Sequence, residues 1–548
     1  MDKLLKFRIP VILVFIGLVI FLGTNIPTIK RDAGIGALLP KDNPDYLYST
    51  EMEELFGSEN QIVIGISSRT TIYRKDVIEV IKRLTDFLSN HEDVYEDDVF
   101  SISKIDNIRG EDGFILVEPL IEEDLLPEDI NYDELRRNIE SNSLFNGRLV
   151  STDGRSTLII ASLGKEITLS DTRLENLTND IRSCIGRLKT RYKNVEINLS
   201  GEPVSMAMVA SYMKTDITKL FPFALIVVII VLIVLLKRFS GVIAPVIVTL
   251  FSIVSAFGLK GIIGSDLTIA ETIIPVMLIA IGCADGVHIA SEFFGHRRKG
   301  MDVKPAIIET MRELTMPVIM TSVTTGLGFA SLLASPGISI KNMGLFLTAG
   351  VMFAMIFSLF LIPMILSFSG SSKPVSPKKP KKAKAYDGEN PIYLKTVKRI
   401  SKRIIRFKKT IAAVSGLFLL ISIIGVLNVE VESDEIQYFK KNNPLRQATD
   451  KIEKDLGGIV SLDIILEGEK SDTMKNPEVL EFIKKMQNYL NKHELVSYSV
   501  SIADYIERMN FVIHDNDKDF NRLPGKIEIV DGEKIPGTFQ TAQLLLLY

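Results

Sequence analysis

Three ionisable side chains stand close together in an otherwise apolar run of the chain. Asp285, His288 and Glu292 are three and four residues apart, so on an α-helix they share one face. A carboxylate in the hydrocarbon of a membrane costs about 2.5–3.5 kcal/mol or more, and such residues usually have a function. A buried carboxyl group can bind and release a proton as its surroundings change. We therefore expect a proton or cation relay here, with a purely structural polar contact as the alternative.

Small and hydroxyl-bearing residues accompany these ionisable groups. Gly282 and Gly286 flank Asp285 and leave room for a neighbouring helix to approach closely. The next apolar run supplies the hydroxyl groups of Thr321, Ser322, Thr324 and Thr325. Such hydroxyls either bond a neighbouring polar group or their own backbone. We expect both sets to support the relay and helix packing.

No pattern in the sequence indicates a metal ion, a cofactor or enzymatic activity. An Asp285/His288/Glu292 metal site would need a further His or Cys on the apolar runs, and we find none to complete it. His91 and His493 each stand alone, as surface residues do. With only Cys184 and Cys283, a disulfide framework and a cysteine-ligated zinc site are excluded. The polar segments lack a Ser/His/Asp elbow, a Gly-rich phosphate loop and an HExxH motif.

The composition indicates membrane spans combined with polar domains. Of 548 residues, 46% are hydrophobic and 24% charged, with a mean hydropathy of +0.23, so apolar and charged residues must be segregated. A bilayer core needs about 20 apolar residues of helix. Seven runs qualify: 9–29, 220–236, 239–259, 267–294, 314–334, 342–368 and 410–429. Glu271, near the outer boundary of the fourth run, is expected to be an interfacial residue.

The distribution of Lys and Arg predicts the orientation. With a cytoplasmic N-terminus, inside segments hold three before the first span, two after the second, five after the fourth and fourteen from Lys373 to Lys409. The short outside connections hold only Lys260 and Lys341. Positive residues concentrate on the cytoplasmic side of membrane proteins. This predicts a multi-pass protein of the plasma membrane with both long polar segments outside, and the net charge of −3 gives no bias toward nucleic acid.

A Lys-rich and Pro-rich stretch follows the sixth span, and its composition predicts a disordered linker over 371–391. Apolar residues then recur at spacings of four and three among basic ones: Tyr393, Val397, Ile400, Ile404 and Phe407. This pattern favours an amphipathic helix on the inner leaflet, with residues 373–409 binding anionic lipid. A charged tether without lipid preference is the alternative.

The chain repeats itself at an offset of 400 residues. The residues from Pro40 to Pro44 match those from Lys440 to Pro444, and the strand pattern QIVIGI at 61 matches SLDIIL at 461. After two extra residues, Leu88 and His91 match Leu490 and His493. Each copy follows a single span, so the second half begins like the first.

These patterns predict a polytopic α-helical membrane protein with extracytoplasmic α+β, porter-like domains and an internal repeat. Within the first copy we expect helices over 45–56 and for about 14 residues from Arg74, with strands at 61–66, 157–162 and 195–199. The expected domains are a first transmembrane helix (1–29), a porter-like domain (30–216), a five-helix bundle (217–369), a basic linker and amphipathic helix (370–409), a seventh transmembrane helix (410–429) and an incomplete second porter-like domain (430–548).

The chain resembles the RND superfamily over nearly its whole length. The resemblance rests on the order of one span, a polar domain and five spans, on GCADGVHIASEF at 282, and on HRRKG and TMPVIMTSVTTGLGFASLLASP after it. It is closest to the MMPL-like, hydrophobe-exporting branch related to Patched and Dispatched, with a sterol-sensing-type bundle. That similarity implies proton-coupled efflux of lipids or other hydrophobic molecules, with Asp285 at the acidic position of span four. Gly286 stands where many mycobacterial relatives have Tyr, which leaves the proton path open.

The resemblance also implies twelve spans, of which we expect the last five to be lost by truncation or supplied by another chain, either a second copy or a separate second-half polypeptide. The leading hypothesis is a proton-coupled exporter of hydrophobic or lipid-like molecules. The alternative is a non-transporting lipid-sensing or partner-recruiting membrane protein, or one component of a split transporter.

Overall fold

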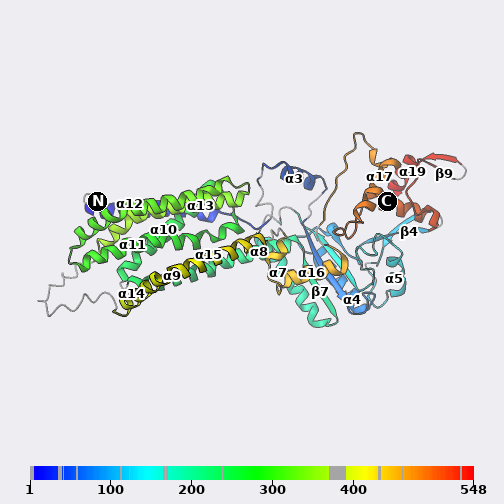
Figure 1. Cartoon of the computed structure of the whole chain (residues 1–548). Coiled ribbons are helices and arrows are strands. Elements are labelled where there is room, and N and C mark those ends of the chain that lie inside the picture. The colour runs from blue at the N-terminus through cyan, green and yellow to red at the C-terminus, as the bar shows by residue number, and fades with distance from the viewer. Residues whose placement is uncertain are drawn as a thin grey trace.

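The protein divides into a bundle of long helices at one end and a mixed α+β lobe at the other (Figure 1). The computed structural model describes residues 5–34, 40, 42–56, 60–111, 114–122, 124–164, 167, 171–236, 239–369, 391–429, 434–458, 461–530 and 533–547. Within this part, seven helices are long and apolar enough to cross a membrane. The seven spans expected from the sequence are thus confirmed as helices.

Six of these helices form the bundle. They are α2 (Arg8–Gly23), α9 (Phe221–Leu236), α10 (Phe239–Ile263), α11 (Ile274–Arg298), α12 (Val303–Ala330) and α13 (Ile338–Leu366). Short 3-10 turns adjoin them: η1 (Ile26–Thr28), η5 (Ile269–Ile273) and η6 (Ser331–Ala334). Helices α10, α11 and α13 pack against one another at the centre, where Phe293, Phe346 and Phe357 are fully buried.

Small residues set the close approach of α2 to α10. A Cβ atom on Gly258 would lie 2.3 Å from the carbonyl oxygen of Leu22, and one on Gly261 would lie 2.0 Å from that of Asn25. Helices in membranes associate largely through such backbone-to-backbone packing. The first span is therefore part of the bundle and not a detached anchor.

One continuous helix joins the lobe to the bundle. Helix α8 (Glu202–Thr215) runs through a π-helical segment, η4 (Asp216–Leu220), directly into α9. Its first part packs against the lobe, whereas α9 carries an apolar sequence of membrane-spanning character. Movement of α9 would therefore be transmitted to the lobe along a single helix.

The lobe is built on a four-stranded antiparallel sheet of order β3-β6-β2-β7. Its strands are β2 (Gln61–Ser68), β3 (Val99–Phe100), β6 (Ser156–Ser162) and β7 (Val195–Ser200). Helices α4 (Lys75–Ser89) and α7 (Asp171–Arg191) pack on it, and α3 (Pro44–Phe56), α5 (Tyr132–Glu140) and the turn η3 (Glu96–Asp98) complete this segment. Every residue of β2 after Gln61 is buried, so both faces of the sheet are covered.

The second polar segment packs onto the first. Helix α16 (Pro444–Leu456) lies against β7 and β6, where Ile452 takes the space left by Gly65 and the Thr449 and Ser200 hydroxyl groups are 2.5 Å apart. Three further helices, α17 (Pro477–Leu490), α18 (Ile502–Ile513) and α19 (Gly537–Leu547), form a small cluster with the hairpin β9 (Ile527–Val530) and β10 (Glu533–Pro536). The turns η7 (Glu435–Tyr438), η8 (Thr473–Lys475) and η9 (Lys518–Phe520) connect these elements.

That small cluster contacts a hairpin of the first segment. Helix α18 packs on β4 (Asp106–Glu111) and β5 (Phe114–Pro119), and a Cβ atom on Gly110 would lie 1.9 Å from the carbonyl oxygen of Val512. Arg508 donates to the carbonyl oxygen of Ile108 at 3.2 Å. The two polar segments are therefore interleaved, and their division into two domains stays a prediction.

The helices of the two repeat copies correspond to each other, whereas the strand of the first copy has no counterpart among the described residues of the second. Helices α3 and α16 begin at Pro44 and Pro444, and α4 has its counterpart in α17. The strand expected at 461 is not observed: residues 461–468 pair with no other strand among the described residues. A strand needs partners for its backbone groups, and β2 has them in β6 and β7.

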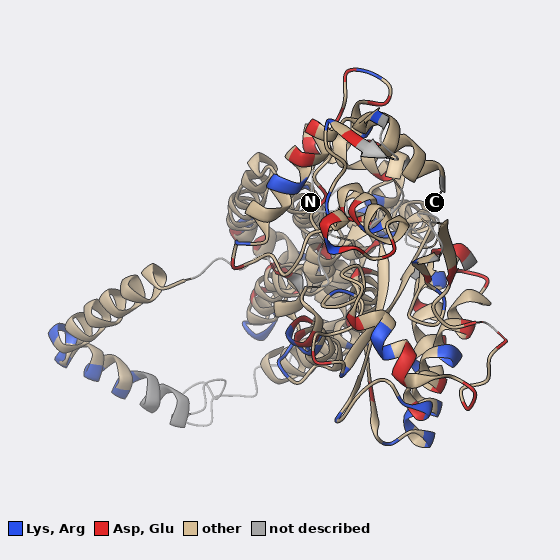
Figure 2. Ribbon diagram, turned by 90° about the vertical axis from the view of Figure 1, so that its right-hand side faces the viewer, with Lys and Arg blue, Asp and Glu red and all other residues tan. Residues whose placement is uncertain are grey.

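The seventh span stands apart from the bundle. Helix α14 (Pro391–Arg406) and α15 (Lys408–Leu427) form a hairpin that projects away from the rest of the molecule (Figure 2). The apolar surface of α15 is exposed along its whole length. Helix α14 confirms the helix expected after the linker, whereas the predicted linker itself, up to residue 390, lies outside the described residues.

Candidate functional site

Asp285 lies on α11, and its side chain faces α12. Its carboxylate accepts a hydrogen bond from Ser322 Oγ at 2.9 Å and a weaker one from Thr321 Oγ1 at 3.5 Å. The aspartate is half-buried, and Ser322 is buried. Among the described residues, these hydroxyl groups are the hydrogen-bond partners of the carboxylate. Asp285 therefore has polar neighbours on an adjoining helix but no basic partner in contact with it.

The hydroxyl groups of α12 differ in what they bond. Thr321 also donates to the carbonyl oxygens of Pro317 and Val318, and Thr324 bonds only its own helix, at Met320 and Thr321. Thr325 is half-buried, one turn beyond Thr321. The structure thus brings Thr321 to Asp285 and leaves Thr324 and Thr325 away from the carboxylate. Ser322 is its nearest partner, which the spacing alone did not single out among the hydroxyls.

The two glycines of α11 lie against α10. A Cβ atom on Gly282 would lie 3.1 Å from Thr249 Oγ1, and one on Gly286 would lie 2.6 Å from Cβ of Pro245. Between them, the Cys283 thiol is 3.2 Å from the hydroxyl of the same Thr249. Close packing against α10 holds this side of α11 in place while Asp285 faces α12.

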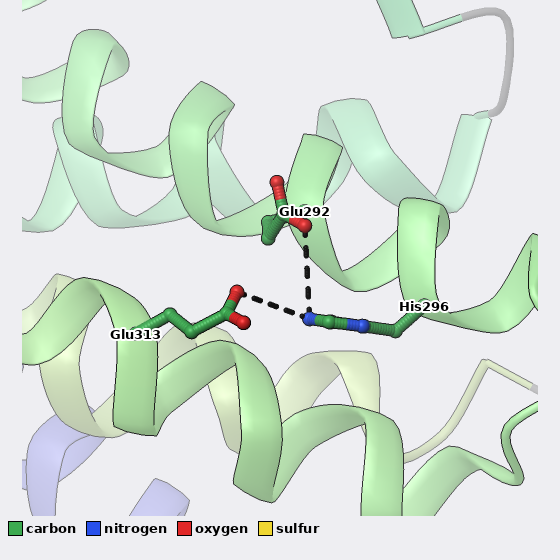
Figure 3. A group of neighbouring side chains, drawn as sticks. All are labelled: Glu292, His296 and Glu313. Atoms are coloured by element: carbon green, nitrogen blue, oxygen red, sulfur yellow. Dashed lines mark hydrogen bonds and ion pairs between the residues drawn. The ribbon is translucent and has the colours of Figure 1, made fainter.

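His288 interacts with Asp285 through charge but forms no hydrogen bond with it among the described residues, and Glu292 lies elsewhere. His288 is exposed on the next turn of α11. Glu292 belongs to a second cluster, where His296 Nε2 lies 3.6 Å from its Oε1 and 3.2 Å from Oε2 of Glu313 on α12 (Figure 3). His296 lies four residues after Glu292 but beyond the apolar run 267–294, so the sequence pattern does not group it with the acids of that run. Glu313 could not be assigned to it without the helix packing.

A buried ion pair lies at the end of the bundle that faces the lobe. Lys260 Nζ and Glu271 Oε1 are 2.7 Å apart, with side-chain exposures of 1% and 0%. Glu271 also accepts from the N–H and hydroxyl of Thr268. Glu271 therefore does not face water at this end of the bundle, because its carboxylate is buried and paired with Lys260.

The same pair anchors the junction between the bundle and the lobe. Lys260 donates to Ser265 at 3.0 Å, Asn342 donates to the same hydroxyl, and the ammonium lies 4.5 Å from the ring centroid of Phe346. Thr268 belongs to β8 (Leu267–Thr268), which pairs with β1 (Arg31–Asp32). The ion pair thus lies next to the short β1–β8 pairing, at the end of the bundle where the chain leaves η1.

The lobe contains a cleft of about 940 Å³ between the sheet, the end of α7 and α16. Its lining is largely polar, and its basic residues, Arg69, Arg155, Lys189, Lys193, Lys451 and Lys454, outnumber its acidic ones, Asp153, Glu196 and Asp455. Such a lining suits water or a charged group and not a hydrocarbon chain.

Comparison with known proteins assigns the chain to a family. A profile of the MMPL family matches residues 49–404, from α3 through the bundle to α14. The chain belongs to the MMPL family. Members of this family are membrane transporters of the RND type. The MMPL chain is also similar to the protein named "Putative membrane protein MJ1562" from Methanocaldococcus jannaschii, with 25% identity over 367 residues, 65% of this chain and 89% of that protein.

Proposed function

We propose that this MMPL protein is a proton-coupled exporter of hydrophobic or lipid-like molecules and that Asp285 is the group that binds and releases the proton. One observation carries the proposal. A carboxylate stands inside a membrane-spanning helix, and its contacts are hydroxyl groups of a neighbouring helix at 2.9 and 3.5 Å. An acid in this position is costly and is seldom kept without a function.

Hydroxyl partners suit a group that changes its charge. A hydroxyl donates to an ionised carboxylate and accepts from a protonated one, so Ser322 can serve both states by rotating its proton. A fixed cation would favour the ionised state alone. Because Ser322 and Thr321 belong to α12, proton binding at Asp285 on α11 would alter the contact between these two helices. Coupling of protonation to helix packing follows from this arrangement.

The cargo would travel outside the polar cleft of the lobe. The basic lining of that cleft disfavours acyl chains, whereas the bundle offers apolar surfaces to the bilayer. A lipid-like molecule would therefore move along helix surfaces, with the continuous α8–η4–α9 helix passing movement to the lobe.

We further propose an orientation in the plasma membrane. The concentration of Lys and Arg predicts a cytoplasmic N-terminus and an extracytoplasmic lobe. Helix α14 would then lie at the inner leaflet, where basic side chains from Lys398 to Arg406 attract anionic lipid by about 1 kcal/mol each.

The test uses the full chain in vesicles with an imposed pH gradient, a trapped pH-sensitive dye and a fluorescent lipid as cargo. We expect Asp285→Asn to bring gradient-driven proton flux and lipid export down to the level of empty vesicles, because an amide cannot bind the transported proton. Asp302→Asn is the matched control, since Asp302 is exposed at the start of α12. Normal gradient-driven export by Asp285→Asn contradicts the proposal.

A second candidate is a lipid sensor or one component of a split transporter. It is favoured by the exposure of His288, Thr321 and Thr324 around Asp285 and of the whole of α15, since these surfaces can receive another polypeptide. In the same vesicles a sensor binds the fluorescent lipid without proton flux. A split transporter gains proton flux only when a second bundle is added.

A further inference from the structure

Three side chains of metal-ligand type meet at the basic end of the helix pair α11–α12. Glu292 and His296 lie one turn apart on α11, and Glu313 faces them from α12 (Figure 3). Their donor atoms, one from each residue, all lie within 4.8 Å of one another. The group spans two helices that are separate in sequence, so it exists only in the folded bundle.

Burial distinguishes this group from an ordinary surface cluster of acids. The side chain of His296 is only 5% exposed, while those of Glu292 and Glu313 are 42% and 43% exposed. The imidazole is thus held in the helix interface and points its Nε2 atom at both carboxylates (Figure 3). A buried, fixed nitrogen with two adjustable oxygen donors is a preorganised arrangement for a cation.

Glu292 and Glu313 share one partner, His296. In the part of the chain that the structure describes, the ion pairs of Glu292 and of Glu313 both go to the one nitrogen of His296. A single N–H donates well to one carboxylate at a time. A bound cation in place of that proton would interact with both carboxylates and with the nitrogen together.

We propose that Glu292, His296 and Glu313 bind a divalent first-row transition-metal ion such as Zn²⁺. Ligand bonds of about 2.0–2.1 Å in tetrahedral geometry place donor atoms about 3.4 Å apart. The two distances from Nε2, 3.2 and 3.6 Å, bracket this value. The exposed glutamate side chains can rotate to bring their oxygen atoms together, and water completes the coordination. One imidazole with two carboxylates favours Zn²⁺ and its neighbours over Mg²⁺ or Ca²⁺, which prefer oxygen alone.

A metal ion here would clamp α11 to α12. Glu292 lies seven residues after Asp285, or about 10.5 Å along the helix, and Glu313 lies nine residues before Ser322, or about 13.5 Å. The site is therefore separate from the Asp285 contact but is carried by the same two helices. Binding would hold their basic ends at a fixed separation whether or not the protein transports protons.

The experiment measures Zn²⁺ binding to the purified full chain in detergent, prepared without a polyhistidine tag. Equilibrium dialysis gives the stoichiometry and affinity, and Co²⁺ absorption in the visible range reports nitrogen and oxygen coordination. We expect one equivalent for the unaltered chain. His296→Gln, Glu292→Gln and Glu313→Gln should each lower the affinity at least about tenfold, as loss of even a supporting contact does in metal sites.

Matched control variants distinguish a specific metal site from nonspecific metal binding. Glu309→Gln changes a glutamate one turn away on α12 that already pairs with Arg312 at 2.7 Å, and His288→Gln changes an exposed histidine on α11. Both should bind Zn²⁺ like the unaltered chain. Because His296 is buried and its replacement could disturb folding, the exposed Glu292→Gln variant provides an independent test with the packing intact.

Two results would overturn the proposal. One is equal Zn²⁺ binding by the unaltered chain and by the Glu292→Gln and His296→Gln variants. The other is a helix pair whose thermal stability depends on pH through His296 but does not change with Zn²⁺, which would make the cluster a proton-bridged contact. Neither result bears on proton flux through Asp285.

Discussion

Two carboxylates of the bundle, those of Glu271 and Asp285, have opposite surroundings. Glu271 is fully buried and has a cation, Lys260, at 2.7 Å, together with two hydrogen bonds from Thr268. Asp285 is half-buried and has only hydroxyl partners, Ser322 and Thr321. The first acid is paired with a cation, whereas the hydrogen-bond partners of the second are neutral hydroxyl groups.

This difference separates a structural acid from a candidate functional one. A buried ion pair is stable only while both partners remain, because removal of one leaves an uncompensated charge. A carboxyl group among hydroxyls loses little when it gains a proton, since hydroxyls serve both states. Position inside a span therefore does not by itself mark a relay, because Glu271 is more deeply buried than Asp285. The type of partner makes the distinction.

The largest effect should come from breaking the Lys260–Glu271 pair. We expect Lys260→Met to destabilise the bundle by about 3–5 kcal/mol, because it leaves Glu271 buried and unpaired. The chain offers a direct measurement, since both of its cysteines are free and buried. In a Cys184→Ser background, the temperature at which Cys283 reacts with a thiol dye reports unfolding of α11.

A double variant and a control complete this test. Lys260→Met/Glu271→Gln removes both charges and should recover most of the lost stability, whereas Lys299→Met, at an exposed lysine, should have little effect. If the single and double variants melt together, the ion pair does not hold the junction.

The next effect concerns the packing that holds Asp285 in place. A Cβ atom on Gly286 would lie 2.6 Å from Pro245, so Gly286→Ala should cost about 1–3 kcal/mol by forcing α11 away from α10. Gly328 on α12 has no atom within 4 Å of such a Cβ, and Gly328→Ala should stabilise its helix by up to about 1 kcal/mol. The Cys283 assay compares them, and a shift of the same sign for both would contradict the role of close contact.

The positions of the membrane spans, and of Asp285 within one of them, could be predicted from the sequence. Runs of apolar residues of bilayer length predict helices, because a helix satisfies its backbone hydrogen bonds in lipid within one continuous segment. The spacing of Gly282, Asp285 and Gly286 likewise placed small residues and an acid on neighbouring faces of one helix. Local patterns of this kind are set within a single element, so the sequence contains them.

The contacts between elements could not be predicted in the same way. Spacing on α11 grouped Glu292 with Asp285, but α12 brings Glu313 to Glu292 and Ser322 to Asp285. The buried ion pair of Glu271 could not be predicted, because its partner, Lys260, lies on another helix. The strand expected at 461 repeated the pattern of β2, yet strand formation depends on neighbours that pattern does not supply.

Asp504 in the lobe offers a third buried acid, with both kinds of partner. Burial alone would raise the pKa of Asp504, but hydrogen bonds from Gln487, from Lys484 at 2.9 Å and from the Ser501 N–H outweigh it and lower this pKa below its usual value. A lowered pKa in the folded state means that the stabilisation is present above the unfolded pKa of about 3.9 and is lost as the pH falls further. The cluster around α18 should therefore loosen below about pH 4.

Pepsin cleavage within α17 and α18, normalised to cleavage of an unfolded peptide at each pH, measures this loosening. We expect the rate to rise as the pH falls from about 4.5 to 2.5, and Asp504→Asn to flatten that dependence. Asp515→Asn is the control, because Asp515 is exposed and has a positive φ of 54° that asparagine also accepts. A steep dependence retained by Asp504→Asn would assign the loosening to other carboxylates.

The smallest effect should distinguish the two hydroxyl partners of Asp285. Ser322→Ala removes a hydrogen bond of 2.9 Å and should cost about 0.6 kcal/mol, as polar contacts between membrane helices do on average. Thr321→Val should cost less, because that hydroxyl is 3.5 Å from the carboxylate and already bonds two backbone carbonyl groups. Double-mutant cycles with Asp285→Asn, read by the Cys283 assay, should show coupling for Ser322 and almost none for Thr321. Equal couplings would mean that both hydroxyls hold the carboxylate alike and that the contact across α11 and α12 does not depend on Ser322 in particular.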